Sequence, residues 1–266
     1  MDAAMKDALT KVPAVTLGFW IIKILATTFG ETMGDTVSMS WLGETTATAG
    51  QSGLNGYVVG TLIFGAVLAA LVWLQIRARA FHPFLYWATI IASTTAGTTL
   101  ADFATRSLGL GYPGGSLLLF GLVVASLVVW RTNLGTISVE SVHTPKAELY
   151  YWLTITFSQT LGTALGDWVA DGSLGYSGAA IIFGSALALL TVLYLTTNVS
   201  RVALFWTAFI LTRPLGAVVG DLLDKPVDKG GLDLSRPIAS AVLLAAIVLL
   251  VVLVPQRAGR KEVGAA

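Results

Sequence analysis

Residues 20–35 read WIIKILATTFGETMGD, and this pattern decides the organisation of the whole chain because it occurs four times. The other copies read WATIIASTTAGTTLAD at 87–102, WLTITFSQTLGTALGD at 152–167 and WTAFILTRPLGAVVGD at 206–221. Every copy starts with Trp, has Gly ten residues later, has Gly or Ala after fourteen and ends with Asp after fifteen. Similarity at fixed spacing is typical of internal repeats, so we predict four of them.

The composition places these repeats in a membrane. Of the 266 residues, 55% are hydrophobic and only 12% are charged, and the mean hydropathy is +0.77. A soluble globular protein has about 25% charged residues, and a disordered chain has few apolar ones, so both classes are excluded. The chain has no Cys, which excludes disulfides, and its net charge of +1 does not favour nucleic-acid binding. An integral membrane protein remains.

A helix needs about 20 apolar residues to cross a membrane. The chain has eight such stretches, at about 14–38, 56–76, 84–105, 114–132, 149–171, 175–197, 201–223 and 237–254. They lack the alternation of polar and apolar residues that is typical of a membrane β-barrel. We therefore predict an all-α membrane protein with eight transmembrane helices in a single domain over residues 1–266.

Each repeat holds two of these stretches, and the repeats cover about 14–76, 84–132, 149–197 and 201–254. Two spans return the chain to the side on which it started, so successive repeats share one orientation. The four units are therefore predicted to be parallel repeats related by an axis along the membrane normal. A pseudo-fourfold ring and a pseudo-twofold pair of pairs both agree with this pattern.

Positive charges predict the orientation, because Lys and Arg are enriched in cytoplasmic loops. The side that holds both termini has ten of them: Lys6, Lys11, Arg77, Arg79, Arg131, Lys146, Arg201, Arg257, Arg260 and Lys261. The opposite side has four: Arg106, Lys225, Lys229 and Arg236. We therefore expect a multi-pass protein of the cell inner membrane with both termini in the cytoplasm.

The repeated Trp…Gly-x-x-x-(Gly/Ala)-Asp pattern resembles a bacterial family of small membrane proteins built from four tandem copies of a repeat of unknown function. The resemblance covers roughly residues 17–254. It implies eight spans and an inner-membrane location. It implies no activity, so the chemistry has to be inferred from the residues themselves.

Each copy carries a polar stripe at positions 7, 11 and 15 after its Trp. Residues four apart lie on one face of a helix, and eleven of these twelve positions are polar. Such a stripe is costly against lipid, so we expect the four stripes to face one another inside the bundle. The stripe residues are Thr27, Glu31, Asp35, Thr94, Thr98, Asp102, Gln159, Thr163, Asp167, Arg213, Ala217 and Asp221.

The stripe carboxylates are candidate ligands for a hard cation. Oxygen ligands suit Mn²⁺, Mg²⁺, Ca²⁺, Na⁺ or protons, whereas copper and closed zinc sites need softer Cys, Met or His ligands. The chain has no Cys, and both His lie in predicted loops. We predict metal ligands at Glu31, Asp35, Asp102, Asp167 and Asp221, with Asp171 as a further ion-binding carboxylate and the polar stripe residues lining the same cavity. The neighbouring glycines either serve helix packing alone or also expose carbonyl ligands.

Lys23 and Arg213 lie inside predicted spans. Lys23 follows Trp20 by three residues, so we expect its side chain to reach the nearby membrane interface. Arg213 is either a built-in cation that competes with the cargo or a fixed counter-ion. The four Trp are expected to mark the cytoplasmic interface, which places each Asp roughly two-thirds to three-quarters of the way across the membrane.

The segment 31–36 is similar to the Glu-x-Gly-Asp-(Lys/Arg)-(Ser/Thr) signature of manganese and calcium exchangers, with one extra residue before Gly34 and no basic residue after Asp35. We expect a gradient-driven transporter of a hard, manganese-like cation, with proton exchange as a candidate coupling. A transporter or channel for a small polar or anionic solute and a non-transporting scaffold or sensor are the alternatives. The sequence shows no catalytic motif or ATP-binding loop, so neither an enzyme nor a cofactor is expected. The expected partners are membrane lipid and the cation, not nucleic acid, and a homo-oligomer is left open.

Overall fold

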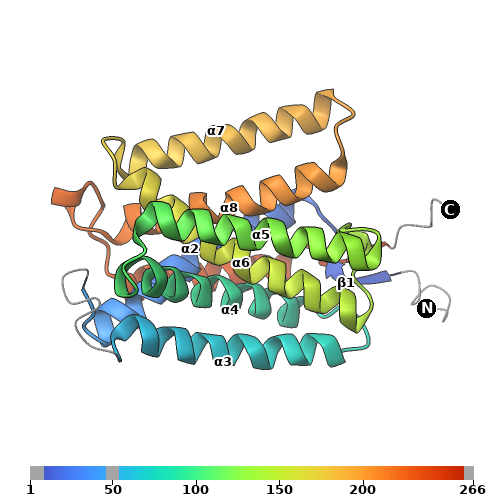
Figure 1. The fold of residues 1–266 in the computed structure, drawn as a ribbon, viewed down its shortest axis with the longest axis horizontal. Coiled ribbons are helices and arrows are strands. Elements are labelled where there is room, and N and C mark those ends of the chain that lie inside the picture. The colour runs from blue at the N-terminus through green and yellow to red at the C-terminus, as the bar shows by residue number, and fades with distance from the viewer. Residues whose placement is uncertain (1–8, 46–53, 261–266) are drawn as a thin grey trace.

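The computed structural model describes residues 9–45 and 54–260, and long helices dominate this part of the chain (Figure 1). It contains eight helices of 18 to 26 residues, one in each expected apolar stretch. They are α2 (Leu17–Asp35), α3 (Gly56–Arg77), α4 (Pro83–Asp102), α5 (Gly111–Leu134), α6 (Pro145–Ala170), α7 (Gly175–Thr196), α8 (Arg201–Asp224) and α9 (Arg236–Leu253). Two π-helical segments, Thr36–Trp41 and Phe103–Ser107, continue α2 and α4, and short 3₁₀ turns occur at Val139–Ser141 and Val227–Lys229.

Local sequence signals explain where these helices start. The Thr16 hydroxyl accepts a hydrogen bond from Phe19 N at 3.2 Å, and Thr144 and Ser200 cap α6 and α8 in the same way. Pro occupies the first turn of α4, α6 and α9, where its fixed φ suits the helix and its missing N–H costs nothing. Short-range chemistry therefore explains the starts of α2, α4, α6, α8 and α9.

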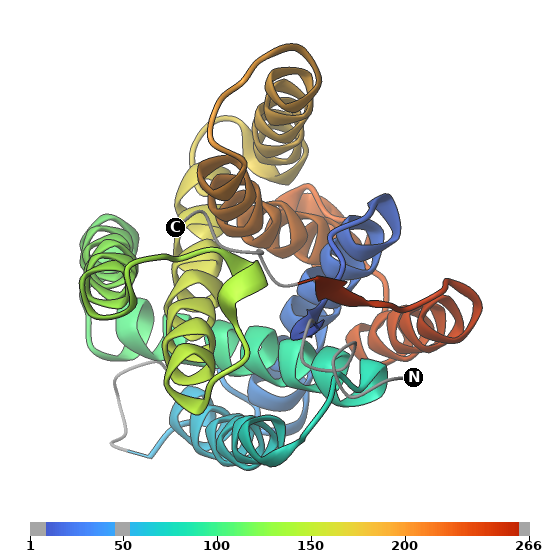
Figure 2. The same cartoon turned by 90° about the vertical axis from the view of Figure 1, so that its right-hand side faces the viewer.

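The first helices of the four repeats form a closed ring at the centre of the molecule (Figure 2). In this ring α2 packs on α4, α4 on α6, α6 on α8, and α8 on α2. We call these four the ring helices. The second helix of each repeat packs mainly on the ring helix of the following repeat, so that α3 lies on α4, α5 on α6, α7 on α8 and α9 on α2. This cyclic order is a pseudo-fourfold arrangement.

Five of the eight helices are long and apolar enough to cross a membrane: α3, α5, α7, α8 and α9. The other three, α2, α4 and α6, are ring helices that carry polar stripes, and most of their residues are buried against other helices. The structure is thus a helical bundle of membrane-protein composition. All three less apolar helices belong to the covered ring, whose fourth member, α8, is apolar enough to span.

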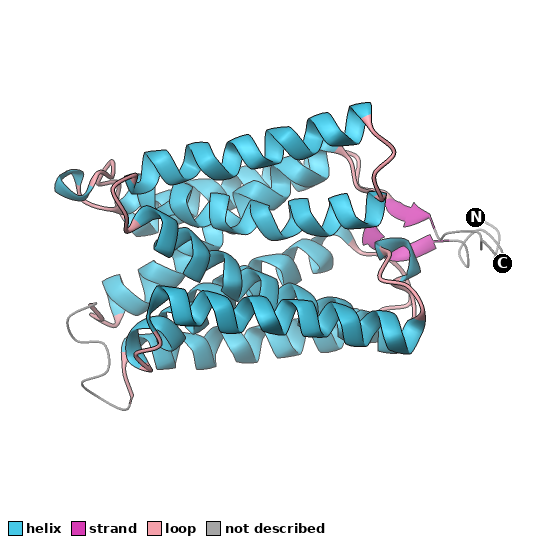
Figure 3. Cartoon of the chain, turned by 45° about the horizontal axis from the view of Figure 1, so that its top comes forward, coloured by secondary structure: helices cyan, strands magenta, loops and turns pink. Residues whose placement is uncertain are grey.

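Both described ends of the chain lie at the same end of the bundle, where they pair as two short strands (Figure 3). Strand β1 (Leu9–Pro13) runs antiparallel to β2 (Ala258–Arg260). This small sheet corrects the all-α prediction: an even number of helices brings the two ends together, and their open backbone groups then bond to each other. Lys11 fixes the sheet to the bundle by an ion pair of 2.7 Å with Glu148. Lys6 and Lys261, which entered the charge count, lie outside the described residues.

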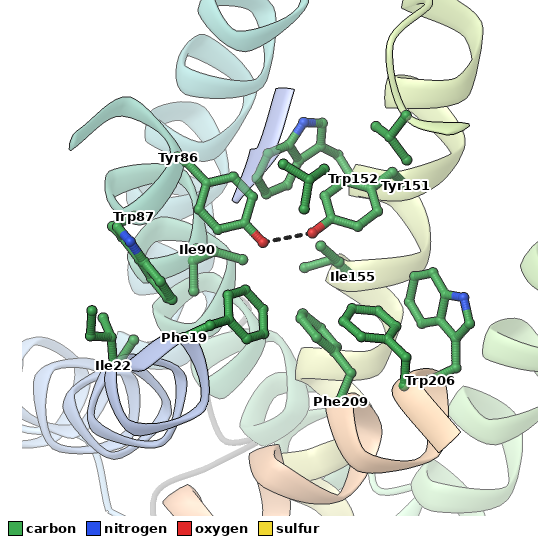
Figure 4. Close-up of a cluster of buried hydrophobic side chains, with 14 of the residues drawn as sticks. Phe19, Ile22, Tyr86, Trp87, Ile90, Tyr151, Trp152, Ile155, Trp206 and Phe209 are labelled. Atoms are coloured by element: carbon green, nitrogen blue, oxygen red, sulfur yellow. Dashed lines mark hydrogen bonds between the residues drawn. The ribbon is translucent and has the colours of Figure 1, made fainter. Parts of the chain in front are cut away.

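An aromatic layer closes the ring at the end that holds the strands (Figure 4). Each repeat contributes its Trp and the aromatic residue before it, and the hydroxyls of Tyr86 and Tyr151 bond at 2.6 Å between the neighbouring helices α4 and α6. The four Trp lie together at this end of the ring, and three of their side chains face inward. Trp87, Trp152 and Trp206 are at most 4% exposed, because their neighbours in the layer are the rings of the adjoining repeats.

Candidate functional site

Each ring helix has a glycine notch that receives the stripe of the next ring helix. The pairs of glycine and incoming side chain are Gly30 with Thr94, Gly97 with Gln159, Gly162 with Arg213 and Gly216 with Thr27. A Cβ at any of these glycines would approach the incoming residue to less than 3.0 Å. Packing therefore requires the glycines, and one of them also exposes a carbonyl, because Gly30 O accepts a hydrogen bond from Thr98 Oγ1 at 3.0 Å.

The four stripes meet at the guanidinium of Arg213 in the middle of the ring. Arg213 is 0% exposed and forms an ion pair of 2.9 Å with Glu31 from α2. It also donates hydrogen bonds to Thr98 of α4, at 2.7 Å, and to Thr163 of α6. One side chain thus joins all four ring helices, so the prediction that the stripes converge inside the bundle is correct.

A second layer of charges lies where the ring helices end, away from the aromatic layer. In one half of it, which we call the Arg106 site, Arg106 bridges two carboxylates, Asp102 at 3.2 Å and Asp167 at 3.0 Å. The hydroxyls of Tyr57 and Tyr112 accept further hydrogen bonds from this guanidinium at 3.0 and 3.4 Å. The Arg106 site therefore holds its cation through four partners.

In the other half, which we call the Lys225 site, the Lys225 ammonium lies among three carboxylates. It contacts Asp35 Oδ2, lies 2.9 Å from Asp221 and lies 3.8 Å from Asp224. Burial disfavours its charged form, but the carboxylates of Asp221, Asp35 and Asp224 outweigh this and raise the pKa of Lys225 well above its usual value. Arg236 is a second cation here, 3.3 Å from Asp224 and 3.9 Å from Asp35. A cluster of carboxylates at helix C-terminal ends needs such cations, because the helix dipole there is negative.

Two groups of three carboxylates have the spacing of metal ligands. Glu31, Asp167 and Asp221, which we call the deep triad, each offer an oxygen within 4.8 Å of the other two. Asp35, Asp221 and Asp224 of the Lys225 site do the same, and Asp221 belongs to both groups. All five residues are at most 7% exposed. The two groups therefore form a continuous set of hard oxygen ligands across α2, α6 and α8.

The Lys225 site borders a cavity of about 400 Å³ at the end of the bundle opposite the strands. Asp224 and Arg236 line this cavity together with Ser40 and residues of the loop before α9. The aromatic layer covers the other end of the ring. In this conformation the charged layer is thus reached more directly from the end opposite the chain termini.

The structure places eleven of the twelve predicted ion-binding residues inside the ring, all at most 7% exposed, namely Thr27, Glu31, Asp35, Thr94, Thr98, Asp102, Gln159, Thr163, Asp167, Arg213 and Asp221. The exception is Asp171, which is exposed and caps the C-terminal end of α6. The twelfth stripe position, the apolar Ala217, is buried against Gly166.

Lys23 does not extend to an interface, as its distance from Trp20 led us to expect. It is 0% exposed and points into the ring, where its ammonium lies 4.1 Å from the centre of the Phe209 ring. Its hydrogen-bond partner is Thr212 Oγ1 at 3.4 Å. Lys23 is buried because α2 directs its side chain toward α8, where the neighbouring helices cover it.

Sequence reasoning missed four charged residues of this layer: Arg106, Asp224, Lys225 and Arg236. Three of them had been counted as loop charges. Two of the four could have been predicted from the stripe. Arg106 and Lys225 follow Asp102 and Asp221 by four residues and so continue the same helix face. Repeats one and three have Met39 and Asp171 at this position.

A closed ring of polar-striped helices inside a belt of apolar ones defines the class: this is a helical membrane protein with internal repeats. Four segments of the chain, 18–81, 85–133, 150–200 and 204–255, match the family described as Repeat of Unknown Function (DUF347), and the chain belongs to it. Each segment spans one ring helix and the helix that follows it. The curated proteins and the solved structures contain no match to the chain.

Proposed function

We propose that the protein is a gradient-driven transporter of a hard cation, built from eight transmembrane helices in four parallel repeats. The bundle has an even number of long helices with both described ends on one side. Lys and Arg are more frequent on that side, which favours an inner-membrane protein with cytoplasmic termini. Because Arg106 and Lys225 are bound inside the charged layer, the opposite side has fewer loop charges than the sequence count gave, and this supports the same orientation.

The deep triad carries the proposal. Its three carboxylates come from three different repeats, and their oxygens lie within 4.8 Å of one another although all three residues are buried. Buried negative charge is costly unless cations or protons compensate it, and in this conformation Arg213, Arg106 and Lys225 pair with the three carboxylates. Oxygen ligands favour Mn²⁺, Mg²⁺ or Ca²⁺ over copper and zinc, and the same groups can take up protons when the metal leaves. Exchange of a divalent cation for protons is the coupling that this chemistry supports.

The aromatic layer supports a transport cycle with access from alternating sides. It seals the ring at the end of the termini, while a cavity reaches the charged layer from the other end. Opening toward the termini requires the aromatic side chains of this layer to separate. The hydrogen bond between the hydroxyls of Tyr86 and Tyr151 is the central polar contact that has to break. The structure described is thus the state that we assign to access from the side opposite the termini.

The experiment is transport in proteoliposomes loaded with a metal-sensitive dye. Mn²⁺, Mg²⁺, Ca²⁺ and Zn²⁺ are added in turn, with and without a pH gradient. Wild-type protein should carry Mn²⁺ better than Zn²⁺, and a proton gradient should change the rate. Asp167→Asn should abolish transport, whereas Asp171→Asn, four residues further along the same helix but exposed, should leave it unchanged.

Two outcomes would overturn the proposal. The first is that no cation moves in wild-type vesicles under any gradient. The second is that Asp167→Asn and Glu31→Gln, which alter two members of the deep triad, both retain full transport. Folding is checked in each variant by its thermal unfolding temperature in detergent, so that loss of transport is not confused with loss of structure.

One observation favours a small polar or anionic solute as the second candidate. At the centre of the ring, Arg213 Nε, Thr94 Oγ1 and both polar atoms of Gln159 are buried without a hydrogen-bond partner. Such groups have free capacity to bind a solute. The same vesicles, tested for uptake of small carboxylates and polar solutes, separate the two candidates. A protein that carries neither class is a scaffold or sensor, in which the stripes and glycine notches only hold the ring together.

A further inference from the structure

We propose that Lys225 is a tethered substitute for the cargo: its ammonium occupies the site of Asp35, Asp221 and Asp224, and an entering divalent cation displaces it. This inference rests on the proposed function. It assigns a first binding site that includes Asp224 and lies between the cavity and the deep triad. The sequence analysis named neither Asp224 nor Lys225 as part of a site.

The three carboxylates around Lys225 retain free capacity for a metal. Asp35 is 1% exposed and its Oδ1 has no hydrogen-bond partner, although Oδ2 contacts Lys225. Asp224 is 4% exposed, and neither of its oxygens has a hydrogen-bond partner. A buried carboxylate oxygen without a partner is unusual in a folded protein. Here the unpartnered atoms belong to residues whose oxygens already have the spacing of metal ligands.

The balance of charge favours a divalent cation over the lysine. Three carboxylates face Lys225 and Arg236, so one negative charge is left uncompensated in this conformation. If a divalent cation replaced the ammonium, the cation and Arg236 together would balance the three carboxylates. At low dielectric such a difference of one charge is large compared with its effect in water.

Displacement requires only a movement of the lysine side chain. The main chain at Lys225 is fixed, because its N–H bonds to Asp221 O at 2.9 Å and its carbonyl accepts a hydrogen bond from Asp233 N at 2.9 Å. Its side chain is 12% exposed and flexible, and the next residue, Pro226, lines the cavity. The ammonium can therefore rotate out toward the cavity while α8 stays in place.

Because Asp221 belongs to both groups of carboxylates, a cation bound in the Lys225 site can move on to the deep triad. A metal bound at Asp35, Asp221 and Asp224 is already coordinated by one member of the deep triad. Moving inward exchanges Asp35 and Asp224 for Glu31 and Asp167 while Asp221 remains a ligand. Lys225 can then return to the emptied outer site, which keeps the buried carboxylates compensated throughout.

The first test measures the accessibility of the lysine amine. Purified full-length protein in detergent is treated with an amine-reactive reagent, with and without Mn²⁺, and the modified lysines are identified by mass spectrometry. Mn²⁺ should increase modification of Lys225. Modification of Lys229, which is exposed in the same loop and serves as the internal control, should not change.

The second test measures the affinity for Mn²⁺ by calorimetry. Lys225→Gln removes the competing charge, so it should bind Mn²⁺ about ten-fold more tightly or better than wild type. Lys229→Gln should bind like wild type. If Lys225→Gln does not fold, Lys225→Arg keeps the charge and replaces a mobile amine by a forked group that holds carboxylates more firmly, so it should bind Mn²⁺ more weakly than wild type.

The outcomes separate this inference from the proposed function. If wild-type protein binds Mn²⁺ but the modification of Lys225 does not change and the variants bind like wild type, Lys225 is a fixed counter-ion and the inference is wrong. If wild-type protein binds none of the divalent cations, the proposed cation site fails, and the role of Lys225 fails with it.

Discussion

The Arg106 site and the Lys225 site are two versions of one arrangement. In each, a basic residue one helical turn beyond the Asp of its own repeat also binds the Asp of the next repeat around the ring. Arg106 joins Asp102 to Asp167, and Lys225 joins Asp221 to Asp35. The base is present in repeats two and four only, so the pseudo-fourfold ring of helices carries a pseudo-twofold pattern of charge.

The two sites differ in how firmly they hold their cation. Arg106 has a rigid fork, of which the two terminal nitrogens contact carboxylates and Tyr hydroxyls, while its buried Nε has no hydrogen-bond partner. Lys225 has a flexible stem, three carboxylates and a cavity next to it. The comparison teaches that duplicated geometry does not imply duplicated function. On the proposal made above, a bound arginine and an exchangeable lysine occupy equivalent positions because Arg and Lys differ in shape and mobility.

The largest effect is expected when Arg106 loses its charge. Arg106→Gln leaves Asp102 and Asp167 buried without a cation, and breaking a buried pair in this way costs about 3–5 kcal/mol of stability. Thermal or denaturant unfolding in detergent measures the change. Arg79→Gln, at an exposed position of the α3–α4 loop, is the control and should change little. If Arg106→Gln lost less stability than Lys225→Gln, the Arg106 site would not be the one that holds its cation more firmly.

Lys225→Gln should destabilise the protein less, by about 1–3 kcal/mol. The reason is that Arg236 remains 3.3 Å from Asp224 and 3.9 Å from Asp35 after the lysine is gone. The measurement is the same unfolding experiment, with Lys229→Gln as control. If saturating Mn²⁺ restores the stability of Lys225→Gln but not that of Arg106→Gln, the metal can take the place of the lysine but not that of the arginine. Equal rescue of both would show that the two sites are equivalent.

Removing the charge of a single carboxylate tests whether Asp224 is a metal ligand of the Lys225 site. Asp224→Asn removes one negative charge from the Lys225 site, and we expect Mn²⁺ to bind about ten-fold more weakly, which corresponds to about 1.4 kcal/mol. Asp228→Asn changes an exposed carboxylate in the following turn and should leave the affinity unchanged. Calorimetric titration checks both. Equal affinities in the two variants would exclude Asp224 as a ligand.

The smallest effect is expected at the Tyr hydroxyls of the Arg106 site. Tyr57→Phe removes one acceptor at 3.0 Å from Arg106, and a single hydrogen bond to a charged group is worth about 1.5–3 kcal/mol at most. Because three partners of Arg106 remain, we expect a loss near the lower value and no change in Mn²⁺ affinity. Unfolding and titration of the same sample measure both quantities. A changed affinity would link the two sites.

Much of the fold could be predicted from the sequence, because the repeat is marked by residues at fixed spacing. The positions of the eight helices and the convergence of the stripes both follow from the period of the α-helix and the cost of polar groups against lipid. The stripe carboxylates in the ring followed as well, whereas Asp171 was wrongly included and Asp224 was missed. Asp171 follows Asp167 by the same four residues that separate Lys225 from Asp221, and each lies just beyond the end of its helix, yet Asp171 is exposed and Lys225 contacts the ring carboxylates, so this spacing alone does not decide which residue belongs to the site.

By itself, therefore, the sequence determined the number of repeats, the helices and the buried polar stripe, since these depend on local spacing and on the contrast between polar and apolar residues. Only the tertiary structure decided which groups meet. The closed ring buries Lys23, which its sequence position assigned to an interface, and three of the four repeat Trp side chains. It also brings Arg106 to Asp167 and Lys225 to Asp35, residues 61 and 190 positions apart. Such pairs depend on which helix follows which around the ring, and that order is set by the fit of each stripe into the glycine notch of its neighbour.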